Sequence, residues 1–294
     1  MDRPLRIGIA GLGTVGTGTL RLLARNRGAI ADRAGREIRP VAVAARDRTR
    51  DRGIDLSGLR WFDDLPLMAR DPEIDVVCEL IGGADGPALD LVRACLEAGK
   101  PVVTANKAML AVHGAELAAL AEAHGATLGY EAAVAGGIPV VKALREGLVG
   151  NRISRVYGIL NGTCNYILTQ MRQSGRPFAE VLAEAQELGY AEADPSFDID
   201  GIDAAHKLAI LAALAFGGRP RFDAVHIEGI RHVAPIDITF AEELGYRIKL
   251  LGVARMTAAG LEQRLHPCMV PGDAPIAQVE GVLNGVVAEG DFVG

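Results

Sequence analysis

The sequence predicts an α/β protein whose first half forms a doubly wound parallel sheet, and three observations support this fold class. Apolar stretches with the length of buried strands recur at residues 5–10, 40–44, 74–80 and 101–104. A glycine-rich turn follows the first of them. Helical stretches follow the last two, at residues 87–99 and 107–124. Such alternation builds a parallel sheet whose ligands bind beyond the carboxyl ends of its strands.

The glycine-rich turn has the spacing of a dinucleotide-binding loop. Strand 5–10 runs directly into the segment 11–16 (GLGTVG) and then into a helical stretch at 17–25. Gly11 permits the tight bend, Gly13 lets the backbone approach a pyrophosphate, and Gly16 lets the helix pack closely on the strand. The helix N-terminus, with Thr14 and Val15, then holds the phosphates. This context favours a Rossmann-type dinucleotide site over a purely structural turn.

The residues after the second strand bear on which dinucleotide is preferred. Strand 40–44 ends in Ala45-Arg46-Asp47, without an acid placed to bind a ribose diol. Arg46 is placed instead to meet a 2′-phosphate, which favours NADP. Asp47 lies one position later and leaves NAD open. Arg46 is equally compatible with a solvated loop cation.

Lys107 follows the strand at 101–104, where the predicted sheet presents its carboxyl edge. We expect it beside the nicotinamide end of the cofactor. A helix dipole disfavours a cation at its N-terminus, so a merely solvated lysine is the weaker interpretation.

Composition narrows the class of protein. The chain has 294 residues, of which 49% are hydrophobic and 23% charged, which is enough for two domains with cores of their own. The net charge of -6 disfavours nucleic acid and anionic membranes as partners. No apolar run reaches spanning length and no signal peptide precedes the first strand, so we expect a cytoplasmic protein. The cysteines lack metal-ligand spacing.

The second half contains the densest group of acids in the chain. Residues 189–207 place five carboxylates around one lysine. We expect Asp200 to cap a helix starting at Gly201, with Asp203 and Lys207 four positions apart on one face. The alternative is an ordinary surface ion pair. Residues 208–216 are apolar nearly all round, which favours a buried helix and a functional lysine.

Two further segments of the second half have the character of ligand-binding turns. Residues 131–139 form a small-residue loop that enters a helix at Pro139 and leaves backbone carbonyls free. A strand at 152–160 precedes the polar turn Asn161-Gly162-Thr163-Cys164-Asn165. Its Thr163 and Asn165 either bind a carboxylate ligand or cap the following helix. Strands near 247–256 and 261–270 complete the half.

Together these motifs resemble homoserine dehydrogenases. The resemblance rests on the segment 11–16, Ala105-Asn106-Lys107, the turn at 161–165 and, above all, residues 185–207. It implies a nucleotide-binding domain over residues 1–130. A substrate-binding and dimerisation domain with an open mixed sheet would follow over residues 131–294. The implied reaction is reversible hydride transfer between L-homoserine and L-aspartate 4-semialdehyde with NAD(P), a step of threonine, methionine and isoleucine biosynthesis.

The resemblance also assigns roles to individual residues. Lys207 becomes the general acid and base, Asp203 and Glu192 hold the substrate, and Lys107 adds positive charge near the reacting oxygen or the cofactor. Gly189 is assigned to the cofactor site. A monovalent cation, expected to be sodium, would bind at Glu131 and at the backbone oxygens of three further residues, Val134, Gly136 and Ile138. Family members of this kind are expected to be homodimers.

At its end the sequence departs from the family pattern. The family continues beyond the region matching 285–294 with a glycine-rich turn and a last helix that return to the nucleotide domain. We therefore expect either a shortened chain or weakened cofactor binding, and we infer no feedback regulation. Two alternatives remain open: a related dehydrogenase of another amino-acid semialdehyde, and a catalytically silent dinucleotide-binding protein.

Overall fold

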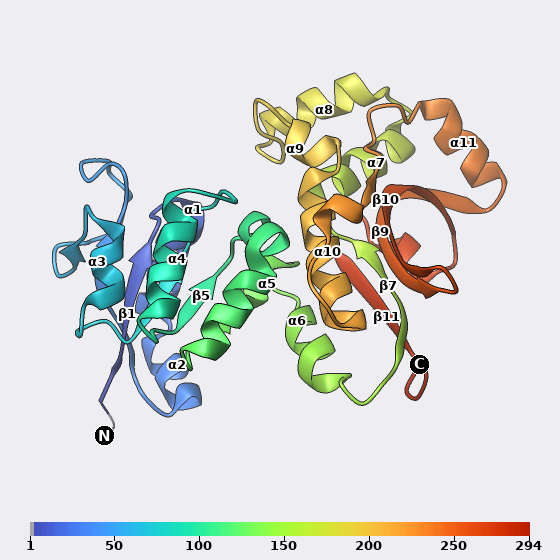
Figure 1. Cartoon of the computed structure of the whole chain (residues 1–294). Helices are drawn as coiled ribbons and strands as arrows, with labels where there is room; N and C mark the ends of the chain where they lie inside the picture. The colour runs from blue at the N-terminus through green and yellow to red at the C-terminus, as the bar shows by residue number, and fades with distance from the viewer. Residues whose placement is uncertain (1–2) are drawn as a thin grey trace. The chain divides into compact units, whose positions relative to one another are not determined.

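The computed structural model describes residues 3–294, which fall into two compact units (Figure 1). The first unit extends to Ala133 and the second comprises Val134–Gly294. The domain boundary predicted after residue 130 lies close to this division. None of the helices among the described residues is long and apolar enough to span a membrane.

The first unit contains a six-stranded parallel sheet with the order β3-β2-β1-β4-β5-β6. The order reverses between β1 and β4, which is the point where doubly wound sheets bind nucleotides. The predicted fold class is confirmed. The elements of this unit are β1 (Leu5–Ala10), α1 (Thr14–Arg25), α2 (Arg27–Ala34), β2 (Ile38–Ala44), β3 (Arg60–Trp61), α3 (Leu65–Arg70), β4 (Val76–Glu79), α4 (Pro87–Glu97), β5 (Val102–Thr104), α5 (Lys107–Ala123), β6 (Leu128–Gly129) and the 3₁₀ turn η1 (Glu131–Ala133).

Side-chain alternation along β1 explains why helices cover both faces of this sheet. Ile7 and Ile9 point into one core cluster, which includes Leu20 of α1. Ala10 belongs to the other cluster, which is built largely from α3, α4 and α5 and includes Leu91. Because successive residues of a strand face opposite sides, one short apolar strand serves both cores.

The second unit contains a five-stranded mixed sheet with the order β11-β7-β9-β10-β8. Only the β10–β8 pair is parallel. The open mixed sheet expected from the resemblance is therefore present. The elements are α6 (Val140–Lys142), the π-helical turn η2 (Ala143–Gly147), β7 (Ile153–Ile159), α7 (Gly162–Ser174), α8 (Phe178–Glu187), α9 (Ser196–Ile199), α10 (Ile202–Phe216), η3 (Phe222–Ala224), β8 (His226–Ile227), α11 (Pro235–Glu243), β9 (Tyr246–Thr257), β10 (Gly260–Pro271), η4 (Pro275–Gln278) and β11 (Gly285–Gly290).

The helix α10 packs on one face of this mixed sheet (Figure 1). Gly252 of β9 allows the close approach, because Leu160 and Leu208 occupy the space that its side chain would fill. Leu208, Ala209 and Leu211 are buried. The predicted apolar helix is therefore a core helix.

Candidate active site

The first turns of α10 carry the predicted pair of charged residues. Asp203 and Lys207 lie one turn apart, and Lys207 Nζ is 2.7 Å from Asp203 Oδ2. Their side chains are 7% and 14% exposed, respectively. An ion pair that is so little exposed is held more rigidly and screened less than an ordinary surface pair. The structure therefore argues against the surface-pair alternative.

The loop that joins β7 to α7 supplies the other partners of this pair. Lys207 Nζ donates a hydrogen bond of 2.7 Å to the main-chain oxygen of Leu160. The amide nitrogen of Asn161 donates to Asp203 Oδ2 and to Asp198 Oδ1, both at 2.9 Å. The site thus brings together α7, α9 and α10. It holds one ammonium among two carboxylates, an amide and a carbonyl.

Thr163 faces the same cluster from the first turn of α7. Its hydroxyl lies 3.1 Å from Asp198 Oδ2 and 2.7 Å from the main-chain oxygen of Tyr190. The N-cap of α7 is Asn161, whose side-chain oxygen accepts a hydrogen bond from the Cys164 amide at 2.8 Å. The capping alternative for Thr163 and Asn165 is therefore wrong. Thr163 remains a candidate substrate ligand at the edge of the cluster.

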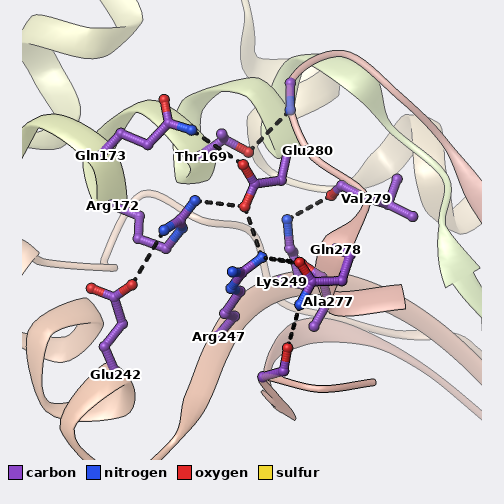
Figure 2. Close-up of polar contacts among 12 residues, drawn as sticks. Thr169, Arg172, Gln173, Glu242, Arg247, Lys249, Ala277, Gln278, Val279 and Glu280 are labelled. Carbon is purple, nitrogen blue, oxygen red and sulfur yellow. Dashed lines mark hydrogen bonds and ion pairs between the residues drawn. The ribbon is translucent and has the colours of Figure 1, made fainter. Parts of the chain in front are cut away.

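Asn165 lies on the other side of α7 and is 2% exposed. Its amide nitrogen donates to the main-chain oxygens of Val279 and Leu283, both at 3.1 Å, and its oxygen accepts from Lys249 Nζ at 3.1 Å. Lys249 also donates to Val279 at 2.6 Å, as Figure 2 shows. A substrate contact would require these bonds to break. The structure supports a role for Asn165 in anchoring residues 279–283, and we do not propose it as a substrate ligand.

Glu280, next to Lys249, also holds the loop of residues 279–283 in place. Glu280 accepts hydrogen bonds from Arg172 at 2.5 Å and Arg247 at 2.9 Å, and Gln173 reaches its second oxygen (Figure 2). Residues 279–283 are thereby tied to α7 and β9. This matters for the site because the main-chain oxygen of Val282 occupies the space that a side chain at Gly162 would need.

The acidic segment before α10 differs in part from the prediction. Asp200 does not cap α10, which begins at Ile202 after Gly201 with no side-chain cap. Gly201 has φ +90°, a conformation that suits glycine. Asp200 instead pairs with Arg231. The short helix α9 intervenes, so the carboxylate of Asp200 is turned toward that arginine.

Glu192 and Gly189 lie in the loop between α8 and α9. Glu192 is exposed, and its side chain makes no hydrogen bond to any described residue. Gly189 follows the end of α8 with φ +76°. Both stay predictions, for substrate and cofactor respectively.

The glycine turn of the first unit has the shape of a phosphate cradle. A side chain at Gly11 would overlap the main chain of Leu80, and one at Gly16 would overlap the carbonyl oxygen of Gly11. Gly13, by contrast, faces open space, and α1 has no side-chain cap at its N-terminus. The exposed amides of Thr14 and Val15 suit a pyrophosphate. The residues present therefore fit a dinucleotide.

The residues after β2 bear on how the ribose of a dinucleotide would be bound. Arg46 is exposed and makes no side-chain hydrogen bond within the described residues. Asp47 Oδ1 accepts bonds from the Thr49 amide and hydroxyl, both at 2.8 Å, and from the Arg50 amide at 3.2 Å. The Thr49 hydroxyl and amide lower the pKa of Asp47. Because the Asp47 carboxylate already accepts hydrogen bonds from Thr49 and Arg50, it is poorly placed to accept them from a ribose diol.

A buried polar network shapes the carboxyl edge of the first sheet beside Lys107. Glu79 is fully buried and accepts from the Thr104 hydroxyl at 2.5 Å and from the Ile81 amide at 2.7 Å. Asn106 caps α5 and donates to the main-chain oxygen of Gly83 at 2.7 Å. Lys107 is the first residue of that helix and is half-buried. The network ties residues 81–83 to the start of α5, where we predicted the nicotinamide end.

The segment of the predicted cation site joins the two units. Glu131 begins η1, and Val134 is fully buried. Ala135 is the only described residue other than glycine with a positive φ, +46°. The Ile138 carbonyl accepts a hydrogen bond from Val140 at 2.8 Å. The ligand set of Glu131 and the carbonyls of Val134, Gly136 and Ile138 stays a prediction.

Sequence reasoning missed two members of the site. Asp198 was one of the five counted carboxylates, and Asn161 was part of the quoted turn, but neither received a role. The sequence does contain one indication of their role: Asn161 shortly precedes α7, which carries Thr163, and Asp198 shortly precedes α10, which carries Asp203. Their meeting depends on the packing of α7 against α9, which no spacing in the sequence encodes.

Comparisons with known proteins agree with this arrangement. The family model described as "Homoserine dehydrogenase, NAD binding domain" matches residues 11–131, and the model "Homoserine dehydrogenase" matches residues 139–294. The chain is 54% identical to a homoserine dehydrogenase of Pseudomonas aeruginosa and 51% identical to one of Neisseria gonorrhoeae. In each case the match covers 99% of this chain and 67% of the relative.

Solved structures give the same result. The crystal structure of a homoserine dehydrogenase from Thiobacillus denitrificans superposes with a TM-score of 0.95 and 52% identity, over 99% of this chain and 67% of that chain. A hyperthermophilic archaeal homoserine dehydrogenase in complex with NADPH matches with a TM-score of 0.83 and 25% identity, over 99% of this chain and 90% of that chain. With a dinucleotide cradle in one unit and a buried lysine–aspartate pair in the other, the chain belongs to the homoserine dehydrogenase family of NAD(P)-dependent oxidoreductases.

Proposed function

We propose that this protein interconverts L-homoserine and L-aspartate 4-semialdehyde with NADP as the preferred cofactor. The proposal rests on the largely buried ion pair of Lys207 and Asp203 in the first turns of α10. The chain's membership of the homoserine dehydrogenase family supports it. An alcohol oxidation needs one group that removes the hydroxyl proton, and the reverse reaction needs a group that returns it to the alkoxide. Lys207 is the candidate for both tasks.

The nicotinamide cofactor, when bound, accepts or delivers the hydride. Lys207 takes the hydroxyl proton during oxidation and donates it during reduction. The Leu160 carbonyl and Asp203 hold Nζ in place through hydrogen bonds of 2.7 Å each. Because both partners are fixed by α10 and by the end of β7, Nζ is already oriented when it acts, as a neutral amine in oxidation and as an ammonium in reduction. Lys107 supplies additional positive charge at the edge of the first sheet.

Acidic groups near Lys207 suit a substrate with an α-ammonium group. We assign Asp203 and the exposed Glu192 to this group, because charge-assisted hydrogen bonds to carboxylates are strong. The Thr163 hydroxyl, at the edge of the same cluster, is assigned to the polar end of the substrate. Cys164 takes no chemical part, since burial raises its pKa well above the ordinary value and the nearby Asp198 and Asp203 add to this effect.

Two observations support the preference for NADP: Arg46 is exposed, and the carboxylate of Asp47 is already hydrogen-bonded to Thr49. The archaeal relative described as an NADPH complex is consistent with it. Replacing Arg46 by alanine should weaken NADP binding about tenfold or more and leave NAD binding nearly unchanged, since the lost ion pair involves only the 2′-phosphate. Arg219→Ala, at an exposed arginine of the second unit, is the matched control.

Four further features follow from the family resemblance and form part of the proposal. A sodium ion would be held by Glu131 and the carbonyls of 134, 136 and 138, in a structural role. The chain would form a homodimer through its mixed sheet. It would work in the cytoplasm, in the biosynthesis of threonine, methionine and isoleucine. Dependence of unfolding temperature on sodium against a matched choline salt tests the ion, and sedimentation tests the dimer.

The experiment that tests the reaction is a measurement of reduced-nicotinamide absorbance with L-homoserine and either NADP or NAD. The native protein should turn over, faster with NADP at low cofactor concentration, and Lys207→Ala should not. NADP binding by the native protein without any turnover would contradict the proposed activity and support a catalytically silent protein instead.

A further inference from the structure

Asn161 connects the two charged residues of the site to the backbone of α7. It is 5% exposed, and its side chain makes three hydrogen bonds. The oxygen accepts from the Cys164 amide at 2.8 Å, and the nitrogen donates to Asp198 Oδ1 and Asp203 Oδ2 at 2.9 Å each. One amide therefore performs two separate tasks: it caps a helix, and it bridges two carboxylates.

The capping bond determines which way the amide faces. In the N-cap position the side-chain oxygen must point toward the free amides of the first turn of the helix. The nitrogen of the same group is then directed away from the helix, toward Asp198 and Asp203. A reversed amide would place an oxygen against two carboxylates and an N–H against the Cys164 N–H. Helix geometry thus enforces the donor orientation.

The bond to Asp203 reaches the oxygen that also binds the lysine. Asp203 Oδ2 accepts from Asn161 at 2.9 Å and from Lys207 at 2.7 Å. The residue before Asn161, Leu160, provides the carbonyl that binds Lys207. Two consecutive residues of one loop thus hold both members of the pair. A change in this loop would move the ammonium and its counter-charge together.

The charge balance around the lysine makes the neutral donor important. Asp198, Asp203, Lys207 and Asp200 all act electrostatically on the buried Cys164 thiol, which shows that these charged groups lie close together. Like charges that share a site repel one another, and a neutral donor between them lowers that repulsion. Asn161 is the residue that stands between Asp198 and Asp203.

We propose that Asn161 is a positioning residue for proton transfer. By bridging Asp198 and Asp203 it keeps Asp203 Oδ2 directed at Lys207 and sets the negative charge that the lysine experiences. The inference rests on the proposed function in so far as Lys207 is the proton-transfer group. It adds a residue that touches neither substrate nor cofactor in the assignment given above.

Two substitutions separate capping from bridging. Asn161→Ser and Asn161→Asp both retain an oxygen that caps a helix, so α7 should stay folded. Serine has no amide nitrogen to bridge the carboxylates. Aspartate has none either, and it adds a further negative charge next to Asp198 and Asp203. Circular dichroism and the unfolding temperature establish that both variants fold.

The kinetic outcome distinguishes positioning from a merely structural role. With Asn161→Ser, kcat should fall about tenfold or more, while the KM for NADP stays unchanged. With Asn161→Asp, kcat should fall as well, and the pH profile of kcat/KM should move upward by about one unit or more, since the added carboxylate favours the ammonium form. A structural role would lower the active fraction in both variants and leave the pH profile in place. Native-like kcat and pH profile in Asn161→Asp would overturn the proposal.

A second measurement does not depend on turnover. The chain contains five lysines, Lys100, Lys107, Lys142, Lys207 and Lys249, so selective ¹³C labelling gives a tractable spectrum. The Cε signal of Lys207, assigned with Lys207→Arg, should titrate at higher pH in Asn161→Asp than in the native protein. An unchanged midpoint would contradict the inference even if the protein acted on another substrate. Absence of homoserine turnover in the native protein would instead contradict the proposed function alone.

Discussion

Lys207 Nζ lies 2.7 Å from Asp203 Oδ2, and both residues sit in the first turns of a helix that is buried from residue 208 to residue 212. The pair therefore cannot relax into solvent as a surface ion pair would. Lys207→Met should reduce kcat by about 10²–10⁴, the range typical of a lost general acid or base, because the group assigned to the proton transfer is removed.

The same substitution should leave cofactor affinity unchanged, since the glycine cradle belongs to the other unit. Stopped-flow and titration measurements with NADP separate the two effects. Lys142→Met is the matched control: its side chain is 67% exposed and lies 3.7 Å from Glu146, a pair worth little. Equal loss of activity in both variants would exclude a specific role for Lys207.

The glycines of the first turn allow a test that separates packing from ligand approach. Gly16→Ala should destabilise the fold, because its side chain would overlap the carbonyl oxygen of Gly11. Gly13→Ala has open space and should leave stability nearly unchanged, while NADP affinity falls about tenfold or more as the new methyl group obstructs the pyrophosphate. Urea unfolding and calorimetric titration provide both quantities.

Gly18→Ala supplies the control in the same helix. Gly18 also has open space around it, but it lies inside α1 instead of at its start. Alanine there should stabilise the protein by roughly 0.5–1 kcal/mol and leave NADP affinity unchanged. Weaker NADP binding by Gly18→Ala would show that helix stability, and not access to the phosphate, explains the effect at Gly13.

Lys249 is 2% exposed, and burial lowers its pKa to about 8. In the unfolded chain the ordinary value of about 10.4 applies. Between these values the unfolded chain binds more protons than the folded protein, so this group makes the protein more stable as pH rises through that window. The stability of the native protein relative to Lys249→Met should therefore increase from about pH 7 to about pH 9.5, by ~1 kcal/mol or more.

Urea unfolding at both pH values checks this sign. The comparison with Lys249→Met is essential, because burial raises the pKa of the Cys78 thiol to about 11, and such thiols make the protein less stable as pH rises. Their contribution is common to both proteins and cancels in the difference. A difference that shrinks with increasing pH would show that Lys249 is not held in a desolvated state.

Sequence patterns predicted those parts of the fold that depend on local periodicity. The strand at 5–10, the glycine turn and the positions of Asp203 and Lys207 follow from patterns with spacings of two to four residues. The structure differs where several weak local preferences compete. Asp200 is an acceptable cap by composition, but Gly201 adopts φ +90° and the chain turns before α10 begins, so its carboxylate meets Arg231.

The rest of the site required tertiary packing. From the sequence, Asn165 and Asn161 are equally plausible site residues, because both are asparagines of the same polar turn. On a helix, four residues separate positions that lie on nearly the same face, but Asn161 is the cap outside the first turn. Asn161 meets the charged cluster, whereas Asn165 meets Lys249 and residues 279–283. The contacts of these two asparagines depend on which segments pack against α7, and this packing cannot be predicted from local sequence patterns.

The buried carboxylate of Glu79 should determine the shape of the loop at residues 81–83. It accepts from the Thr104 hydroxyl and from the amides of Ile81 and Gly82. In Glu79→Gln an amide replaces one acceptor oxygen, so the Thr104 hydroxyl loses the group to which it donates. An unsatisfied buried donor costs about 1–3 kcal/mol, and unfolding in urea should show a loss of that size.

The matched control for Glu79→Gln is Thr104→Val, which removes the hydroxyl and leaves the carboxylate bound to both amides. Its cost should come mainly from the lost hydroxyl bonds, and the loop should keep its position. NADP affinity should fall in Glu79→Gln, because the bonds from the Ile81 and Gly82 amides then lose their charged acceptor, and stay close to native in Thr104→Val, where both bonds to the carboxylate remain. If both variants bind NADP as the native protein does, the loop is positioned by its glycines and by Asn106 without help from Glu79.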